Sequence, residues 1–121
     1  MAHLIALVQG IYFFVFGIWP MLHMNSFLRV TGPKTDLWLV KTVGLLLAVI
    51  GVVFIFAYYK TGINSSIVFL AIGSALSLAV IEFIYVAKRV ISLIYLADAV
   101  IELALITWWL LDIMVFRYPL A

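Results

Sequence analysis

The chain has 121 residues, of which 69% are hydrophobic and only 10% are charged. A soluble domain usually carries about 25% charged residues, so this composition excludes a protein that faces water on all sides. The formal net charge of +2 is too small and too scattered for a nucleic-acid-binding protein. The lack of cysteine excludes a disulfide framework, a thiolate metal site and a thiol nucleophile. The length allows a single integral membrane domain, residues 1–121.

The first predicted helix covers about residues 3–28. A bilayer core of about 30 Å requires roughly 20 apolar residues in a helix. The segment from His3 to Trp19 approaches this length, and the helix is expected to continue past Pro20 toward Leu28. The segment has no basic start and no small-residue cleavage site, which favours a retained helix over a removed signal peptide.

Three further apolar segments predict helices over about residues 37–59, 65–87 and 91–116. The connections between them are short and contain glycine, proline or basic residues. Long helices joined by short loops lie antiparallel to their neighbours. The predicted fold class is therefore all-α, an antiparallel bundle of four transmembrane helices with both termini on the same side.

Basic residues predict the orientation of this bundle. The first and third connections carry four of them, and the opposite side carries two. The first group is Arg29, Lys34, Lys88 and Arg89, and the second is Lys60 and Arg117. Because basic loops tend to stay in the cytoplasm, we expect loops 29–36 and 88–90 to be cytoplasmic.

Ionisable residues lie inside the apolar segments. Lys41, Glu82, Asp98 and Glu102 all fall in the half of the bilayer nearest the first and third connections. At 1.5 Å per residue, they lie roughly 6 to 16 Å inside the predicted helix ends. A charge at the bilayer centre costs about 3 kcal/mol, so such residues normally face the bundle interior and pair. Asp98 and Glu102 are four residues apart and share one helix face.

Lys41 is the predicted counter-charge of this acidic cluster. On the second helix it lines up with Gly44 and Gly51, small residues that let helices approach closely in lipid. Three acids do not balance one lysine, so in a dry site at least one of Asp98 and Glu102 is expected to be protonated. A proton, a metal ion, an amine ligand or a partner's side chain would supply the missing positive charge.

Four further residues are predicted at the rim of the cluster: His23, Arg29, Arg89 and Tyr95. For His23, a simple interfacial position is the alternative. His3 is about 30 Å from His23 along a straight helix, so the two histidines cannot share a metal ion. No metal site is predicted. A polar clamp that fixes the packing of the last three helices is the alternative to a ligand or ion site.

Other polar and aromatic residues have structural interpretations. Asp112 is expected at the membrane interface, one turn from the end of the last helix. Gln9 is expected to form an interhelical hydrogen bond, and Gly10 and Gly17 to contact a neighbouring helix. The aromatic run at 12–16 is expected to face lipid or the core.

The sequence contains no phosphate loop, no HExxH motif, no nucleophile elbow and no strand pattern of a dinucleotide-binding fold. The cofactor, if the protein has one, is therefore left unknown by the sequence. Two carboxylates near a lysine could perform proton chemistry in an apolar site, but that arrangement is not specific to enzymes. A membrane enzyme ranks below the non-enzymatic functions.

The glycines of the first helix, Gly10 and Gly17, and the stretch GLLLAVIG from Gly44 to Gly51 resemble the DoxX-like group of small four-helix bacterial membrane proteins. This resemblance implies a four-helix fold in the bacterial inner membrane. The segments TGPKTDLWLVKTVG and YLADAVIE resemble motifs of an uncharacterised bacterial family. Neither resemblance implies an activity or assigns site residues. A sterol-isomerase-like bundle with buried acids would share the same pattern.

Three functions fit these observations. The first is a non-enzymatic protein that binds a small amphiphilic or cationic ligand, or a proton, at the acidic cluster. The second is an accessory subunit of a larger membrane complex, because the chain has almost no mass outside the membrane. The third is a small transporter that works as a homodimer, although the two halves show no internal repeat. All three place the chain in a lipid bilayer and none involves nucleic acid.

Overall fold

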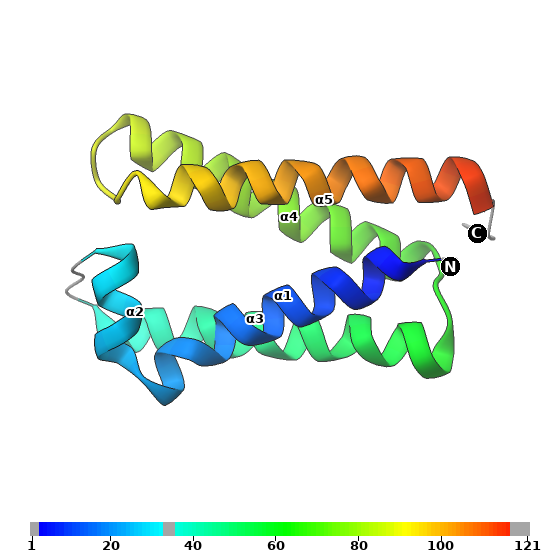
Figure 1. The fold of residues 1–121 in the computed structure, drawn as a ribbon, viewed down its shortest axis with the longest axis horizontal. Coiled ribbons are helices and arrows are strands. Elements are labelled where there is room, and N and C mark those ends of the chain that lie inside the picture. Colours follow the sequence, from blue (N-terminus) through cyan, green and yellow to red (C-terminus); the bar gives the residue numbers. More distant parts are fainter. Residues whose placement is uncertain (1–2, 33–35, 117–121) are drawn as a thin grey trace.

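The computed structural model describes residues 3–32 and 36–116, and the elements found there are helices (Figure 1). They are α1 (Leu4–Leu22), α2 (Met24–Thr31), α3 (Leu37–Phe56) with a π-helical continuation (Ala57–Thr61), α4 (Ser65–Ala87) and α5 (Ile94–Phe116). Four of the helices, α1, α3, α4 and α5, are long and apolar enough to cross a membrane. The predicted fold class is confirmed. The start of α1 and the end of α5 lie together at what we call the terminal end, opposite the α2 end (Figure 1).

The outer surface of the bundle is apolar. Leu22, Phe69, Leu93 and Met114, for example, are between 71% and 81% exposed. Exposed apolar side chains over most of a surface are a liability in water, but lipid is their preferred surrounding. The structure therefore has the surface of an integral membrane protein.

The sequence predicted that the first helix continues toward Leu28. The structure shows that this prediction is wrong, because α1 ends at Leu22. Pro20 lies in its last turn and cannot donate a backbone hydrogen bond. At His23 the chain turns, and the imidazole Nδ1 accepts the backbone N–H of Ser26 at 3.1 Å. This contact caps a separate helix, α2, which leaves the axis of α1 and runs toward α5 (Figure 1).

The connection between α4 and α5 is also longer than predicted. Arg89 has a left-handed backbone conformation, with φ of 59°. The predicted start at Ile91 lies in a turn, and α5 begins at Ile94. The hydroxyl oxygen of Ser92 accepts the backbone N–H of Ile94 at 3.4 Å. The helix therefore starts three residues later than the apolar pattern indicates.

Paired glycines bring α1 and α3 into close contact. Gly10 faces Gly51 and Gly17 faces Gly44, so backbone lies directly against backbone. A Cβ atom on Gly10 would lie only 2.7 Å from the carbonyl oxygen of Gly51. Small residues of this kind allow close helix packing in lipid. The predicted helix contacts of Gly10 and Gly17 are confirmed.

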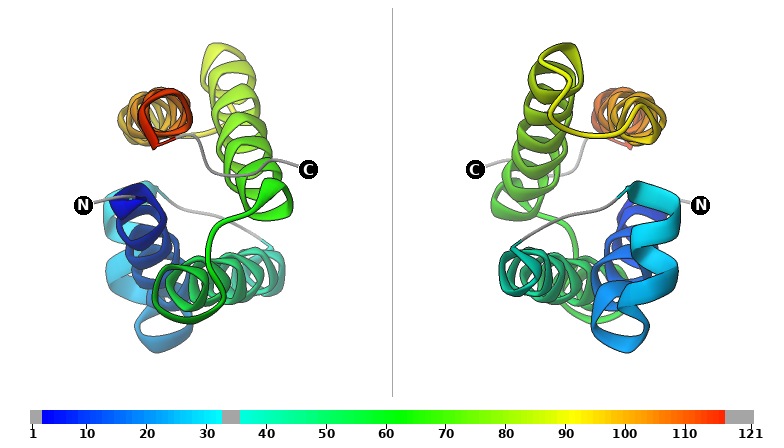
Figure 2. Two further views of the ribbon diagram at one scale, coloured as in Figure 1. Left: turned by 90° about the vertical axis from the view of Figure 1, so that its right-hand side faces the viewer. Right: turned by 90° about the vertical axis from the view of Figure 1, so that its left-hand side faces the viewer.

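The remaining long helices form a second pair, in which α4 packs mainly on α5. The end-on views in Figure 2 show α1 and α3 on one side of the bundle and α4 and α5 on the other. Ala71, Ala75 and Ala79 of α4 are buried, as is Ala99 of α5. The small-residue face of α4 therefore points into the protein.

Polar side chains join the two pairs near the terminal end. The indole Nε1 of Trp109 donates to Gln9 Oε1 at 2.6 Å, and Gln9 Nε2 donates to the carbonyl oxygen of Ala71 at 3.1 Å. Gln9 thus links α1 to both α4 and α5, which confirms its predicted interhelical hydrogen bond. His3 Nδ1 lies 2.7 Å from Asp112 Oδ2, and the His3 backbone N–H donates to Oδ1 at 3.1 Å. We call these contacts the terminal clamp.

We expect Gly17→Ala to destabilise the protein. The added methyl group would lie 2.7 Å from the backbone nitrogen of Ala48, so α1 and α3 must move apart. Overpacking of this kind typically costs about 1–3 kcal/mol. The measurement is the free energy of unfolding in mixed detergent micelles.

Gly73→Ala is the matched control, because within residues 3–32 and 36–116 no atom beyond its own turns of α4 lies within 4 Å of a Cβ at that position. Alanine is up to about 1 kcal/mol better than glycine inside a helix, so this variant should be unchanged or slightly more stable. Equal stability of the Gly17 and Gly73 variants would contradict the close α1–α3 contact.

Candidate functional site: an acidic cavity at the α2 end

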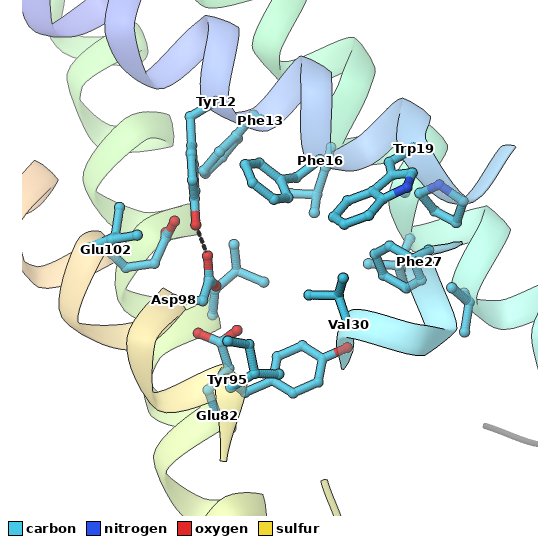
Figure 3. Close-up of a pocket in the computed structure, with 18 of the residues that line it drawn as sticks. Tyr12, Phe13, Phe16, Trp19, Phe27, Val30, Glu82, Tyr95, Asp98 and Glu102 are labelled. Carbon is cyan, nitrogen blue, oxygen red and sulfur yellow. Dashed lines mark hydrogen bonds between the residues drawn. The ribbon is translucent and has the colours of Figure 1, made fainter. Parts of the chain in front are cut away.

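A cavity of about 700 Å³ opens at the α2 end of the bundle (Figure 3). Side chains from α1 to α5 all contribute to its lining. Most of the lining is apolar, and three acidic residues provide its charged wall. We call it the acidic cavity. Its aromatic lining comprises Tyr12, Phe13, Phe16, Trp19, Phe27 and Tyr95.

The structure brings three of the predicted site residues together on this wall. Glu82 comes from the last turns of α4, and Asp98 and Glu102 come from the first half of α5. The four-residue spacing on α5 places Asp98 and Glu102 on one face, as expected. Figure 3 shows the three carboxyl groups grouped beside the phenol of Tyr12.

Tyr12 of α1 donates a hydrogen bond from its hydroxyl group to Asp98 Oδ1 (Figure 3). The bond crosses from one helix pair to the other, at the boundary between the terminal clamp and the cavity. It occupies one oxygen of Asp98 and holds the phenol against the acids. Asp98 is therefore the acid that the protein itself supplies with a donor.

Glu102 has no such partner within the described part of the chain. Its side chain is 0% exposed, and neither carboxyl oxygen takes part in a hydrogen bond. Glu82 is 6% exposed, and its Oε1 is likewise unpartnered. A buried polar group without a hydrogen bond costs about 1–3 kcal/mol, and more when it is charged. Because Glu82 and Glu102 line a cavity, a bound molecule can offset this free-energy cost by bonding to their oxygens.

Lys41 does not join the cluster. It is exposed on α3 and does not line the cavity, and among the described residues it forms no ion pair with an acid. Its neighbour Val40 lines the cavity instead. At roughly 100° per residue, the lining residues Leu39, Val40 and Val43 share one arc of α3, and Lys41 lies outside that arc. The buried face of α3 continues from Gly44 to Gly51, but it does not extend back to Lys41.

The predicted rim residues divide into two groups. Tyr95 lines the cavity, near its α2 side (Figure 3). His23, Arg29 and Arg89 are exposed and do not line it. His23 has a structural role, because its ring caps α2. The arginines lie at the α2 end, outside the site.

The donor set defines what the site can bind. Carboxyl oxygens accept hydrogen bonds and attract positive charge, and in a low-dielectric site they can also hold protons. No group of three or more histidine, cysteine or acidic side chains in residues 3–32 and 36–116 is arranged to hold a metal ion. The carboxyl groups can receive a proton or the positive group of an organic cation.

Sequence reasoning missed two partners of the acids. Tyr12 begins a stripe with Phe16 and Trp19, at spacings of four and three residues, which is one face of a helix. That spacing could have marked the cavity face within the aromatic run. Asp112 is 4% exposed and bonded to His3, a contact that the sequence did not predict. The signal that could have predicted this contact is topology: in an antiparallel four-helix bundle, His3 and Asp112 lie at the same end.

Comparisons with protein-family models, with curated proteins and with solved structures find no match for this chain. The site is therefore interpreted from its own geometry.

We expect the contact between Tyr12 and Asp98 to stabilise the bundle. A double-mutant cycle with Tyr12→Phe and Asp98→Ala should give a coupling energy of about 0.5–2 kcal/mol, the range of polar contacts between membrane helices. The measurement is again the free energy of unfolding in micelles. Tyr12→Phe combined with Asp36→Ala is the control, because Asp36 is exposed and does not line the cavity. Additive effects in the first cycle would contradict the bond.

Proposed function

We propose that this integral membrane protein binds a small amphiphilic cation in the acidic cavity. The observation that carries the proposal is Glu102, whose carboxyl group is fully buried, unpartnered in the described residues and part of the cavity wall. Burial disfavours the charged form of such an acid, and a proton, a positive group or a hydrogen-bond donor offsets this cost. Because Lys41 lies outside the cavity, the positive charge that the acids require is left to a ligand.

The remaining walls suit the apolar part of such a ligand. Cavities of roughly 300–1,000 Å³ with apolar and aromatic walls and few polar groups are typical of small-molecule sites. The ring faces of Phe16, Trp19 and Phe27 surround the space opposite the acids (Figure 3). Aromatic faces also attract cations, by about 0.5–2 kcal/mol. An apolar body with one positive group therefore matches both walls.

The rest of the fold supports this function by keeping the cavity in place. The terminal clamp holds the two helix pairs together at one end, and the cavity lies at the other. Phe27 and Val30 of α2 form part of its lining. The indole of Trp19 packs edge-on against Phe27, with ring centroids 5.4 Å apart, and donates to Ser26 Oγ at 2.8 Å. These contacts fix α2 as one wall of the site.

The orientation is also a proposal. On its resemblance to the DoxX-like group and on its basic residues, we place the chain in the bacterial inner membrane with the α2 end in the cytoplasm. Because the chain has no cysteine, single-cysteine variants can be labelled cleanly. A membrane-impermeant maleimide should label Ser66→Cys, but not Asn25→Cys, from the outside of intact cells. Both positions are exposed, Asn25 on α2 and Ser66 at the start of α4. The reverse pattern would overturn the orientation but not the site.

The binding test uses dansylcadaverine, a fluorophore that carries a primary ammonium group, added to the protein in lipid nanodiscs. Fluorescence should rise and saturate with the wild type, and its N-acetylated, uncharged analogue should bind at least about tenfold more weakly. Glu102→Gln should lose most of the binding of the charged probe, because it removes the unpartnered carboxylate.

Asp36→Asn is the matched control. It also replaces an acid by an amide, but Asp36 is exposed and does not line the cavity, so binding should be unchanged. Equal binding of the charged and acetylated probes, or equal binding to wild type and Glu102→Gln, would rule out a cation site. In that case the cluster would be a packing device, and copurification of larger partners would favour an accessory subunit.

A further inference from the structure

We infer that the cation of the acidic cavity donates N–H hydrogen bonds, so that the site takes a protonated lipophilic amine or amidine and discriminates against quaternary ammonium ions. This inference rests on the proposed function and concerns the chemical class of its ligand. It comes from counting the hydrogen-bond acceptors and donors in the cavity wall.

The acceptor side of this count is unfilled. Glu82 Oε1, Glu102 Oε1 and Glu102 Oε2 are buried and accept no hydrogen bond within the described residues. Most buried polar side-chain atoms have a hydrogen-bond partner, and an unbonded carboxyl oxygen remains costly even when a positive charge neutralises the group. A positive charge alone therefore does not complete the site.

The side-chain hydrogen-bond donors in the cavity wall either have another acceptor or point away from the acids. The hydroxyl group of Tyr12 donates to Asp98, and the indole of Trp19 donates to Ser26 Oγ at 2.8 Å. The phenol of Tyr95 extends toward Val30 and not toward the acids (Figure 3). The backbone N–H groups near the acids are engaged within α4 and α5. Apart from a proton on the acids themselves, the donors for these oxygens are therefore left to a bound molecule.

The three unfilled oxygens distinguish between kinds of cation. A primary ammonium group has three N–H donors, which equals the number of unfilled oxygens. A trimethylammonium group has the same charge but presents only methyl groups, and would leave all three oxygens unbonded in a dry wall. Charge-assisted hydrogen bonds are about twice as strong as neutral ones, so the difference in affinity should be large.

The test compares dansylcadaverine with its N,N,N-trimethylammonium analogue, both titrated into wild-type protein in nanodiscs of neutral lipid. The two probes share the same body, charge and fluorophore. We expect the primary ammonium to bind about 10- to 100-fold more tightly, the range set by hydrogen bonds to a charged group. Empty nanodiscs provide the correction for partition into lipid.

Each outcome separates the inference from the proposed function. If the trimethylammonium probe binds as tightly as the primary ammonium, the hydrogen-bonding class is wrong while the cation site stands. If neither probe binds above the empty-nanodisc level, both are overturned. The wild-type comparison requires no variant, so it does not depend on whether a mutant folds.

Glu102→Gln gives a second, independent readout. The amide keeps one acceptor oxygen but removes the carboxylate, so the preference for the primary ammonium should shrink toward equal binding of the two probes. Asp36→Asn should keep the wild-type preference, because that acid is outside the cavity. A preference that persists unchanged in Glu102→Gln would show that Glu102 does not receive the N–H groups.

Discussion

The close backbone contact between α1 and α3 determines where the other elements lie. In lipid there is little hydrophobic drive to bring helices together, so packing depends on how near their backbones can come. The glycine pairs Gly10–Gly51 and Gly17–Gly44 make this approach, because the glycines place no side chain of their own between the two backbones. The resulting pair then meets α4 and α5 through the terminal clamp, in which Gln9 bonds to both helices. With the pairs joined at one end, the space between them is left to the other end.

The break after α1 closes part of that space. Pro20 removes one backbone hydrogen bond from the last turns of α1, and His23 begins a new helix by capping α2. A straight continuation would have carried residues 24–28 away along the α1 axis. The turn instead brings Phe27 against Trp19 and makes α2 a wall of the cavity. The same local chemistry that shortens the helix thus shapes the site.

The acidic wall shows a division of labour between residues of one type. Asp112 is buried but bonded to His3, and Asp98 is bonded to Tyr12, so both are satisfied by α1. Glu102 is equally buried and has no bond among the described residues. The first two acids join helices, whereas the carboxyl oxygens of Glu102 have no hydrogen-bond partner among the described residues. Completion by a ligand is the physical basis of the proposed binding function.

The sequence by itself determined the fold class, because only helices satisfy their backbone groups in lipid and four segments were long enough to span it. It also determined that Glu82, Asp98 and Glu102 lie in the same half of the membrane, since depth follows from counting residues along a helix. Rotation about the helix axis was decided by tertiary packing. The small residues of α3 suggested that Lys41 faces inward, but the buried residues of α3 begin at Gly44, and Val40 lines the cavity in place of Lys41. The partners Tyr12 and His3 were likewise decided by which helices touch, and residue spacing along one helix carries no information about its neighbours.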